Sequence, residues 1–309
     1  MDPEASPSVA MLSAAAKEHG VFLVGGEIAP HRRPCAAPRA CLAPFLSWHG
    51  VSPRGRASSR CPAHSGPAAA AAFRTPPREF RPVSPRPRVY CHSISARTPT
   101  PAAPAGSVAE LGPAPADGSA APVFNTCTVW GPDGALLCRH RKMHLFDIDV
   151  PGRITFRESD SLTPGSDLAS FDTPHGRFGV GICYDLRFPQ LSSLLRNRLG
   201  CDAVVFPGAF NTTTGPVHWE LLLRSRALDN QMFVAACSPA RNPDASYQAW
   251  GHSTVVDPWG AVVATTGHEE DVVIAELNMP RVAEVRTNIP VSKQTRTDLY
   301  TDVTWKAAE

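Results

Sequence analysis

The sequence predicts an α/β fold class, with helices packed against a sheet, and three observations support this. Short apolar runs typical of buried strands alternate with segments whose apolar residues recur at helical spacing. Glycines and prolines stand where these segments end, as expected at turns and helix termini. Of the 309 residues 43% are hydrophobic, which is enough to bury the core of one large domain or two modest ones.

The expected elements follow one another along the chain. Residues 11–18 end a helix, and residues 21–29 form a buried strand that a glycine turn closes. Residues 125–130 and 135–142 form a hairpin around the turn GPDG. The remaining strands are expected in 168–185, 201–210, 232–239, 251–267 and 271–278, and the remaining helices in 188–200, 218–231 and 280–289.

Residues 31–122 differ from the rest of the chain in composition and charge. This stretch carries 17 of the 32 prolines, and its 12 arginines against three carboxylates give it a charge of +9. Because the whole chain has a net charge of +2, the other residues sum to −7. No helical or strand period persists here, so we predict a disordered Pro/Ala/Arg-rich insertion. It separates an N-terminal fragment of the domain, 1–30, from the main part, 123–309.

Three functional interpretations compete with an unstructured insertion. They are an arginine-rich arm that binds nucleic acid, a docking segment around SPRPR, and a displaced targeting peptide. Such an arm would give salt-sensitive nucleic-acid binding that deletion of 31–122 abolishes. The internal position argues against a targeting peptide. We adopt the unstructured insertion, and nucleic acid is not an expected partner.

The cysteines and the apolar runs predict the compartment. Nine cysteines are scattered without a C-x-x-C pair, which argues against a zinc site or a disulfide framework and favours a reducing, intracellular environment. The start MDPEASPSVA lacks the basic and apolar regions of a secretory signal. No run approaches the ~18 apolar residues of a membrane helix. We therefore expect no metal and no membrane partner, and a cytoplasmic location with mitochondria as an additional one.

One cysteine stands in a setting that suits a nucleophile. In GICYDLRF, Cys183 follows an expected strand and precedes an expected helix, and Gly179 and Gly181 allow a close approach. A helix N-terminus lowers the pKa of a thiol, as at other strand–turn–helix nucleophile sites. A cysteine among apolar residues is more often an inert core thiol, so this pattern alone leaves both interpretations open.

Two charged residues add to this pattern. Lys142 is the only lysine between Lys17 and Lys293 in a chain that otherwise uses arginine, which suggests a site that needs a compact ammonium group. Glu158, in the segment ITFRES, is able to hold such a lysine. Each of the two taken alone is more often a solvated surface charge.

Four blocks of the sequence, in the same order, resemble the carbon–nitrogen hydrolase (nitrilase) superfamily, and within it the omega-amidase branch. They are RKMHLFDIDVPG, GICYDLRFP, FPGAFNTTTGPVHWELLLRSRALDN and WGHSTVVDPWG. The resemblance covers residues 11–28 and 123 to about 303. It implies an α-β-β-α sandwich of the nitrilase type, here incomplete at the N-terminus. It also implies a Glu-Lys-Cys triad, no metal or organic cofactor, and a homodimer.

The resemblance implies roles for individual residues. Cys183 would attack an amide carbonyl to form a thioester, while Lys142 and the backbone N–H of Tyr184 would stabilise the oxyanion. Glu158 would position the lysine and the substrate. Arg187 would either meet a substrate carboxylate or form a structural ion pair. The implied reaction hydrolyses the side-chain amide of a dicarboxylic 2-oxo acid, 2-oxoglutaramate or 2-oxosuccinamate, to the dicarboxylate and ammonia.

The N-terminal part departs from the family pattern. Relatives carry a general base glutamate in a PE motif well before the helix that matches residues 11–18. Only ten residues precede that helix here, and Glu4 lies too close to it for this role. The family's first strand and first helix also lack a counterpart. Two functions therefore stay open: an omega-amidase, and a catalytically impaired family member that acts as an interaction or assembly protein.

Overall fold

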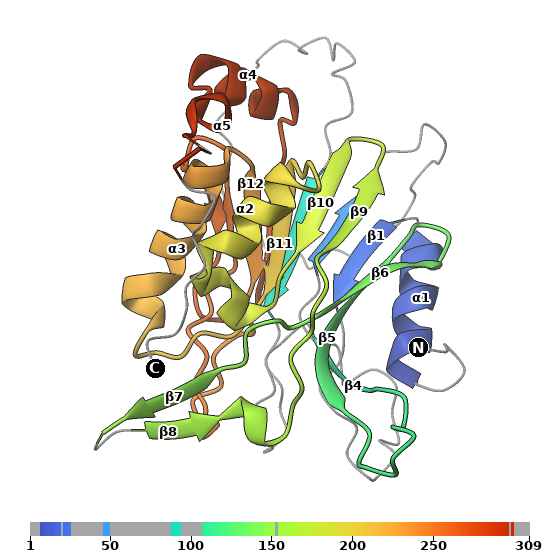
Figure 1. Ribbon diagram of the computed structural model, residues 1–309. Helices are drawn as coiled ribbons and strands as arrows, with labels where there is room; N and C mark the ends of the chain where they lie inside the picture. The colour runs from blue at the N-terminus through green and yellow to red at the C-terminus, as the bar shows by residue number, and fades with distance from the viewer. Residues whose placement is uncertain are drawn as a thin grey trace, which may run out of the picture.

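The protein is a four-layered α-β-β-α sandwich, in which two sheets face each other and helices cover their outer faces (Figure 1). This confirms the expected fold class. The structure, a computed structural model, describes residues 7–19, 21–25, 46–49, 88–93, 107–151, 154–296 and 298–299. Within these residues no helix combines the length and the apolar character needed to cross a membrane.

The first sheet has the strand order β15-β3-β2-β1-β5-β4, and β6 also pairs with β5. Its strands are β1 Val21–Gly25, β2 Leu46–His49, β3 Arg88–Ser93, β4 Val108–Leu111, β5 Val123–Trp130, β6 Leu136–Arg141 and β15 Asp271–Glu276. β5 and β6 form the hairpin predicted around GPDG. Nearly every residue of β5 is buried, so this strand contacts neighbours on both of its faces.

The second sheet has the strand order β14-β13-β12-β11-β10-β9. Its strands are β9 Ala169–Thr173, β10 Gly176–Val180, β11 Ala203–Pro207, β12 Phe233–Cys237, β13 Thr254–Val256 and β14 Val262–Thr265. β10, β11 and β12 are parallel, and helices connect them. Their carboxyl ends therefore share one edge of the sheet, where sites of α/β proteins form.

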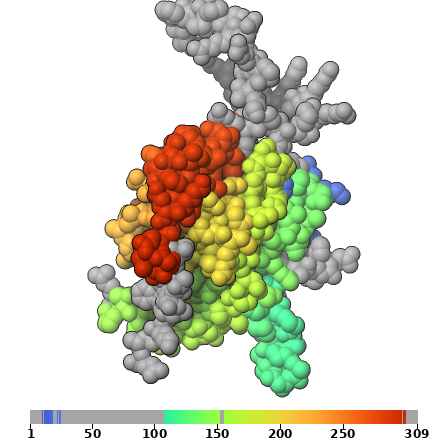
Figure 2. Space-filling view, turned by 45° about the horizontal axis from the view of Figure 1, so that its top comes forward, coloured from blue at the N-terminus to red at the C-terminus, as the bar shows by residue number. Residues whose placement is uncertain are grey.

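Helices cover the outer face of each sheet. α1 Pro7–His19 covers the first sheet, and α2 Pro189–Asn197 and α3 Gly215–Asn230 cover the second. α4 Pro280–Asn288 and α5 Val291–Gln294 lie at one end of the sandwich (Figure 1). Apolar side chains of α2 and α3, among them Leu195 and Leu223, pack on the second sheet, and burial of each contributes roughly 2 kcal/mol. Leu12 and Ala16 of α1 pack on Trp130 of the first sheet. In Figure 2, α4 (orange-red) lies beside α2 (yellow) on the surface.

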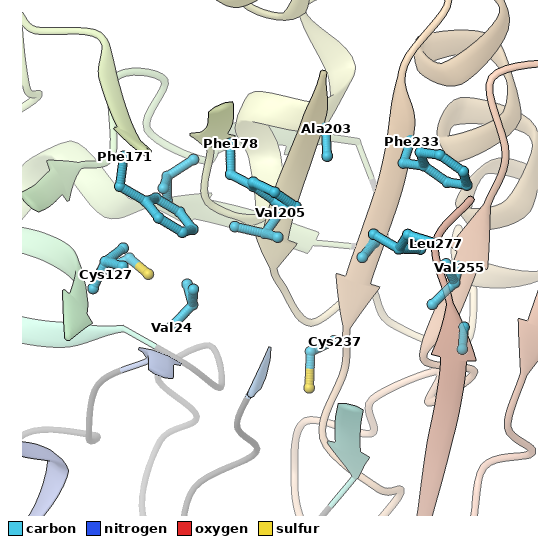
Figure 3. Close-up of a cluster of buried hydrophobic side chains, with 14 of the residues drawn as sticks. Val24, Cys127, Phe171, Phe178, Ala203, Val205, Phe233, Cys237, Val255 and Leu277 are labelled. Atoms are coloured by element: carbon cyan, nitrogen blue, oxygen red, sulfur yellow. The ribbon is translucent and has the colours of Figure 1, made fainter. Parts of the chain in front are cut away.

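The layer between the sheets is filled by side chains from both of them. Figure 3 shows Val24 and Cys127 of the first sheet near Phe171, Phe178 and Val205 of the second. All five are among the core residues that are less than one tenth exposed. Because each fully buried phenylalanine contributes about 2–3 kcal/mol, this apolar layer fixes the two sheets against each other and defines the edge where the site lies.

Three strands of the first sheet fall inside 31–122, the range predicted to be an unstructured insertion. β2 and β3 lie between β1 and β15, while β4 pairs with β5. The prediction gave no strands in this range, because segments of four to six residues are specified by partners across the sheet and no local period reveals them. Figure 2 shows the turquoise residues that follow residue 107 projecting from the body. Residues 31–45, 50–87 and 94–106 of the predicted insertion lie outside the described residues.

Candidate active site

Cys183 lies on a sharp turn at the carboxyl end of β10, where the short 3-10 helix η2, Cys183–Arg187, begins. Its φ of 43° is in the left-handed region, a conformation that costs on the order of 1–3 kcal/mol for a residue other than glycine. Gly208, after β11, permits a close approach, because a Cβ there would stand 2.8 Å from the Cα of Cys183. The turn therefore presents the thiol between the ends of two parallel strands.

Lys142 and Glu158 form a buried ion pair beside this turn. Lys142 follows β6, and Glu158 opens the 3-10 helix η1, Glu158–Asp160, after the hairpin of β7 Asp147–Val150 and β8 Ile154–Arg157. The Nζ of Lys142 donates to Oε2 of Glu158 at 2.5 Å, and the two side chains are only 2% and 8% exposed. Oε2 also accepts the backbone N–H of Phe146 at 2.7 Å. The carboxylate thus fixes the lysine, as expected from the sequence.

All five residues predicted for the site line one cavity of about 580 Å³. They are Lys142, Glu158, Cys183, Tyr184 and Arg187. Among the lining residues that the structure describes, Glu158 is the only carboxylate. No group of three or more His, Cys, Asp or Glu side chains is arranged to hold a metal ion in the described part of the chain. The remaining lining residues include Ser107, Val108, Ala109, Asn125, Phe146, Phe156, Phe210, Asn211, Thr214, Ser246 and Tyr247.

The thiol of Cys183 is in a different electrostatic setting from the one predicted. Burial raises its pKa, and the positive charge of Lys142 opposes this only in part. The sulfur donates to the carbonyl oxygen of Ala209 at 3.7 Å. The prediction that a helix N-terminus lowers this pKa is wrong, because η2 has only five residues and the thiol is desolvated. At neutral pH the protonated thiol therefore dominates, and Lys142 is the charge that favours the thiolate.

Arg187 forms part of the cavity wall and has no carboxylate partner in the described part of the chain. Its guanidinium lies 4.6 Å from the ring centroid of Phe210, and Nη1 lies 3.1 Å from Nδ1 of His218. Burial lowers the pKa of Arg187, and no acidic residue of the described chain contributes to it. Of the two predicted alternatives, the structural ion pair is therefore not formed among the residues that the structure describes. The cation faces a cavity that can receive an anion.

The backbone of η2 offers hydrogen-bond donors at the same cavity. Tyr184 stands in the first turn of η2, where backbone N–H groups have no intrahelical acceptor. Its ring packs edge-on against Phe146 and Phe188, with centroids 5.0 Å and 5.4 Å away. The carboxyl end of η2 is held by Arg226, whose Nε donates to the carbonyl of Leu186 at 3.0 Å. These contacts fix the orientation of the turn.

Two residues at the site were missed by the sequence analysis. The Oη of Tyr247 donates to the carbonyl of Ala209 at 2.6 Å, and burial raises its pKa. Asp185 is fully buried and accepts hydrogen bonds from His140 and His144. The sequence carried a signal for the second, because the two histidines flank the lysine at equal spacing in RHRKMH. Tyr247 gave none.

Comparison with known proteins agrees with this fold. The sequence profile of the carbon–nitrogen hydrolase family matches residues 95–287, which is more than half of the chain. The chain therefore belongs to the carbon–nitrogen hydrolase family. It is 58% identical over 179 residues to omega-amidase NIT2 of Mus musculus, and 60% identical over 178 residues to omega-amidase NIT2-A of Xenopus laevis. These alignments cover 58% of this chain and 64% of each relative, so the chain matches less than two thirds of their length.

Two solved structures are also similar. The crystal structure of Saccharomyces cerevisiae Nit3, a member of branch 10 of the nitrilase superfamily, is 46% identical with a TM-score of 0.54, over 62% of this chain and 65% of that one. The C. elegans NitFhit protein is 40% identical with a TM-score of 0.55, over 63% of this chain and 47% of that one. The similarity predicted from four sequence blocks, to the nitrilase superfamily and its omega-amidase branch, is confirmed.

Proposed function

We propose that the protein is an omega-amidase-like hydrolase. It hydrolyses the side-chain amide of a dicarboxylic 2-oxo acid, 2-oxoglutaramate or 2-oxosuccinamate, and releases the dicarboxylate and ammonia. The observation that carries the proposal is the meeting of Cys183 with the Lys142–Glu158 pair at one cavity. The identity of 58% to omega-amidase NIT2 of Mus musculus and of 60% to omega-amidase NIT2-A of Xenopus laevis supports the choice of branch.

In the first half of the reaction the sulfur of Cys183 attacks the amide carbonyl carbon. A carbon–sulfur bond forms, and the carbonyl oxygen becomes an oxyanion that the Nζ of Lys142 and the backbone N–H of Tyr184 stabilise. One such donor typically lowers the barrier by about 3 kcal/mol. The carbon–nitrogen bond then breaks, and ammonia leaves with the proton that the thiol has lost.

In the second half water hydrolyses the thioester. The hydroxyl of water joins the carbonyl carbon, the carbon–sulfur bond breaks, and a proton returns to the sulfur. The Oε2 of Glu158 is occupied by Lys142 and Phe146, so this residue positions the ammonium group. Within the described chain its Oε1 accepts a single long hydrogen bond, 3.4 Å, from Nδ2 of Asn125, which leaves capacity for a hydrogen bond to substrate or water.

Arg187 suits the terminal carboxylate of such a substrate. It is half buried at the wall of the cavity, beside the nucleophile, and no carboxylate of the described chain neutralises it. A guanidinium presents two parallel N–H donors to a carboxylate, which fixes orientation as well as charge. Apolar rings, among them Phe146, Phe156 and Phe210, line the cavity around it, so a charge pair formed there is screened less than in bulk water.

The test is ammonia release from 2-oxoglutaramate by the purified protein, beside its Cys183→Ala variant. The proposal predicts release by the wild-type chain and none by the variant, with both proteins folded. Arg187→Lys serves as a specificity control, since it keeps the positive charge but loses the two parallel N–H donors of the guanidinium. It should raise KM for 2-oxoglutaramate more than for a neutral short amide. Absence of ammonia release by a folded, monodisperse wild-type sample would contradict the proposal.

We also propose that the protein works as a homodimer in the cytoplasm or mitochondria. Support for the dimer comes from α3, which exposes Val217, Leu221 and Leu228 on its outer side. Residues spaced by four and seven share one face of a helix, so these side chains form one stripe. Trp259, 48% exposed, lies in the turn beside that helix, because Gly260 accepts a hydrogen bond from Arg224. Such a stripe is typical of a surface that another subunit covers.

A further inference from the structure

A buried carboxylate joins the turn that carries Cys183 to the segment that carries the lysine. Asp185 lies in η2, and its side chain has no exposed surface. Its Oδ2 accepts the backbone N–H of Ile182 at 3.0 Å and Nε2 of His140 at 2.9 Å. Its Oδ1 accepts the backbone N–H of His144 at 3.0 Å and the Nδ1 of the same residue at 2.8 Å. Each carboxylate oxygen therefore accepts from two donors.

These four contacts reach both members of the proposed pair. Ile182 directly precedes Cys183, and the two histidines stand two residues before and two residues after Lys142. The backbone of Lys142 is held in addition by Asn125, to whose carbonyl it donates at 2.8 Å, and by the N–H of Gly165, which donates to it at 2.8 Å. The carboxylate thus connects the nucleophile's turn to a segment that is itself fixed.

The two histidines have few alternatives to this contact. The ring of His140 is fully buried, and its Nδ1 has no hydrogen-bond partner within the described chain, so Asp185 makes its polar contact there. The ring of His144 stacks on Phe188, with centroids 3.6 Å apart and an angle of 8° between the planes. Phe188 follows η2, so the same cluster holds both ends of the nucleophile's turn.

We infer that Asp185 is a positioning residue that sets the distance between the sulfur of Cys183 and the ammonium group of Lys142. It touches no substrate and acts through the two residues it aligns. The inference deepens the proposed function and rests on it, but it predicts a property of the thiol that needs no substrate. A misplacement of about 1 Å between reacting groups can cost on the order of 10²-fold in rate, so such a clamp has a measurable effect.

Charge alone predicts the opposite effect, which makes the sign of the result informative. Burial is the largest cause of the raised pKa of Cys183, and the negative charge of Asp185 adds to it. Replacing this carboxylate by an amide removes that charge, which by itself favours the thiolate and speeds its reaction with an electrophile. Loss of the clamp moves Lys142 away from the sulfur, and this slows the same reaction.

The experiment compares alkylation of Cys183 by iodoacetamide at pH 7.5 in the full chain, with site-resolved mass spectrometry to follow this one cysteine. Asp185→Asn is nearly isosteric. The amide NH₂ group, however, takes the place of an oxygen that accepted two hydrogen bonds, and it faces those two donors without being able to accept from them. Asp202→Asn is the control, because Asp202 accepts from Arg286 at 2.7 Å just before β11, at the opposite end of that strand from the cavity. The melting temperature of each variant is measured in parallel, together with kcat and KM for 2-oxoglutaramate.

We expect the alkylation rate of Cys183 to fall about tenfold in Asp185→Asn and to change less than twofold in Asp202→Asn. This difference should hold even if the two variants lower the melting temperature by the same amount. The rate of turnover should fall through kcat, with KM little changed. An unchanged or faster alkylation in folded Asp185→Asn would overturn the inference. If ammonia release is absent in every variant and alkylation still falls, the proposed function fails while the inference stands.

A milder variant keeps the inference testable if Asp185→Asn does not fold. His144→Ala removes the side-chain contact of His144 with Asp185 and keeps the hydrogen bond from the backbone N–H of the same residue. The side chain of His144 is 30% exposed, so its loss disturbs the core less. It should slow alkylation about threefold at unchanged secondary structure. A folded His144→Ala variant with the wild-type alkylation rate would equally overturn the inference.

Discussion

The chemistry of the site depends on how one thiol, one ammonium group and one carboxylate share a buried space. Glu158 and Lys142 neutralise each other, so neither brings an uncompensated charge into the interior. The position of Cys183 strains its backbone and raises the pKa of its thiol. The lysine partly offsets that rise, and this explains why the chain keeps a compact ammonium here in place of its usual arginine.

The raised pKa of Cys183 predicts the pH dependence of its reactivity. Because the thiolate is the reactive form, alkylation by iodoacetamide should rise about tenfold per pH unit from pH 6.5, and still be rising where an ordinary cysteine levels off. Lys142→Met should raise the pKa further and slow alkylation at every pH in this range. An unfolded peptide with the sequence GICYDLRF is the control, and it should level off at lower pH. A rate already maximal at pH 7 would contradict this account.

At the scale of elements, β4 is the piece that completes the cavity wall. Val108 and Ala109 line the cavity, and β4 pairs with β5 along its length. Glu110, whose side chain is 5% exposed, ties β4 to its neighbours. It accepts from Oγ1 of Thr126 at 2.7 Å and from Nε of Arg141 at 2.9 Å. The wall of the cavity therefore depends on a buried polar contact between strands.

Glu110→Ala should loosen β4 because it leaves a buried hydroxyl and a guanidinium without their acceptor. We expect a loss of about 1–3 kcal/mol in the free energy of unfolding, with faster amide hydrogen exchange in β4 and the facing part of β5. Glu220→Ala is the matched control, since Glu220 pairs with Arg224 at 3.4 Å on an exposed helix face. It should cost no more than ~1 kcal/mol. Equal effects of the two variants on exchange in β4 would contradict this role.

The same elements show what the sequence could and could not predict. α2 and α3 were predictable because their apolar residues recur at helical spacing and pack on one sheet. The hairpin of β5 and β6 was predictable because GPDG marks its turn. β4 was not predictable, because a strand of four residues shows no clear period. The role of Glu110 depends on hydrogen-bond partners 16 to 31 residues away in the sequence. Asp185 was missed although His140 and His144 flank Lys142 at equal spacing, because these histidines lie more than 40 residues before it and their spacing does not identify their partner.

At the scale of the whole molecule, the sandwich places its site at one edge and leaves an apolar stripe on α3. If this stripe, with Leu221 at its centre, is the dimer surface, a charge there should separate the subunits. We expect Leu221→Glu to sediment as a monomer while the wild-type chain sediments as a dimer. Glu220→Ala, on the neighbouring position, should stay dimeric. A wild-type chain that is monomeric at micromolar concentration would contradict the dimer.

The central claim is that the thiol of Cys183 is acylated by an amide with loss of ammonia. The most direct measurement is the mass of the protein after acid quenching within the first turnovers with 2-oxoglutaramate. The account predicts an added 2-oxoglutaryl group on the peptide that contains Cys183, which hydroxylamine removes and which Cys183→Ala lacks. Ammonia release without any adduct, or an adduct that persists in Cys183→Ala, would contradict it.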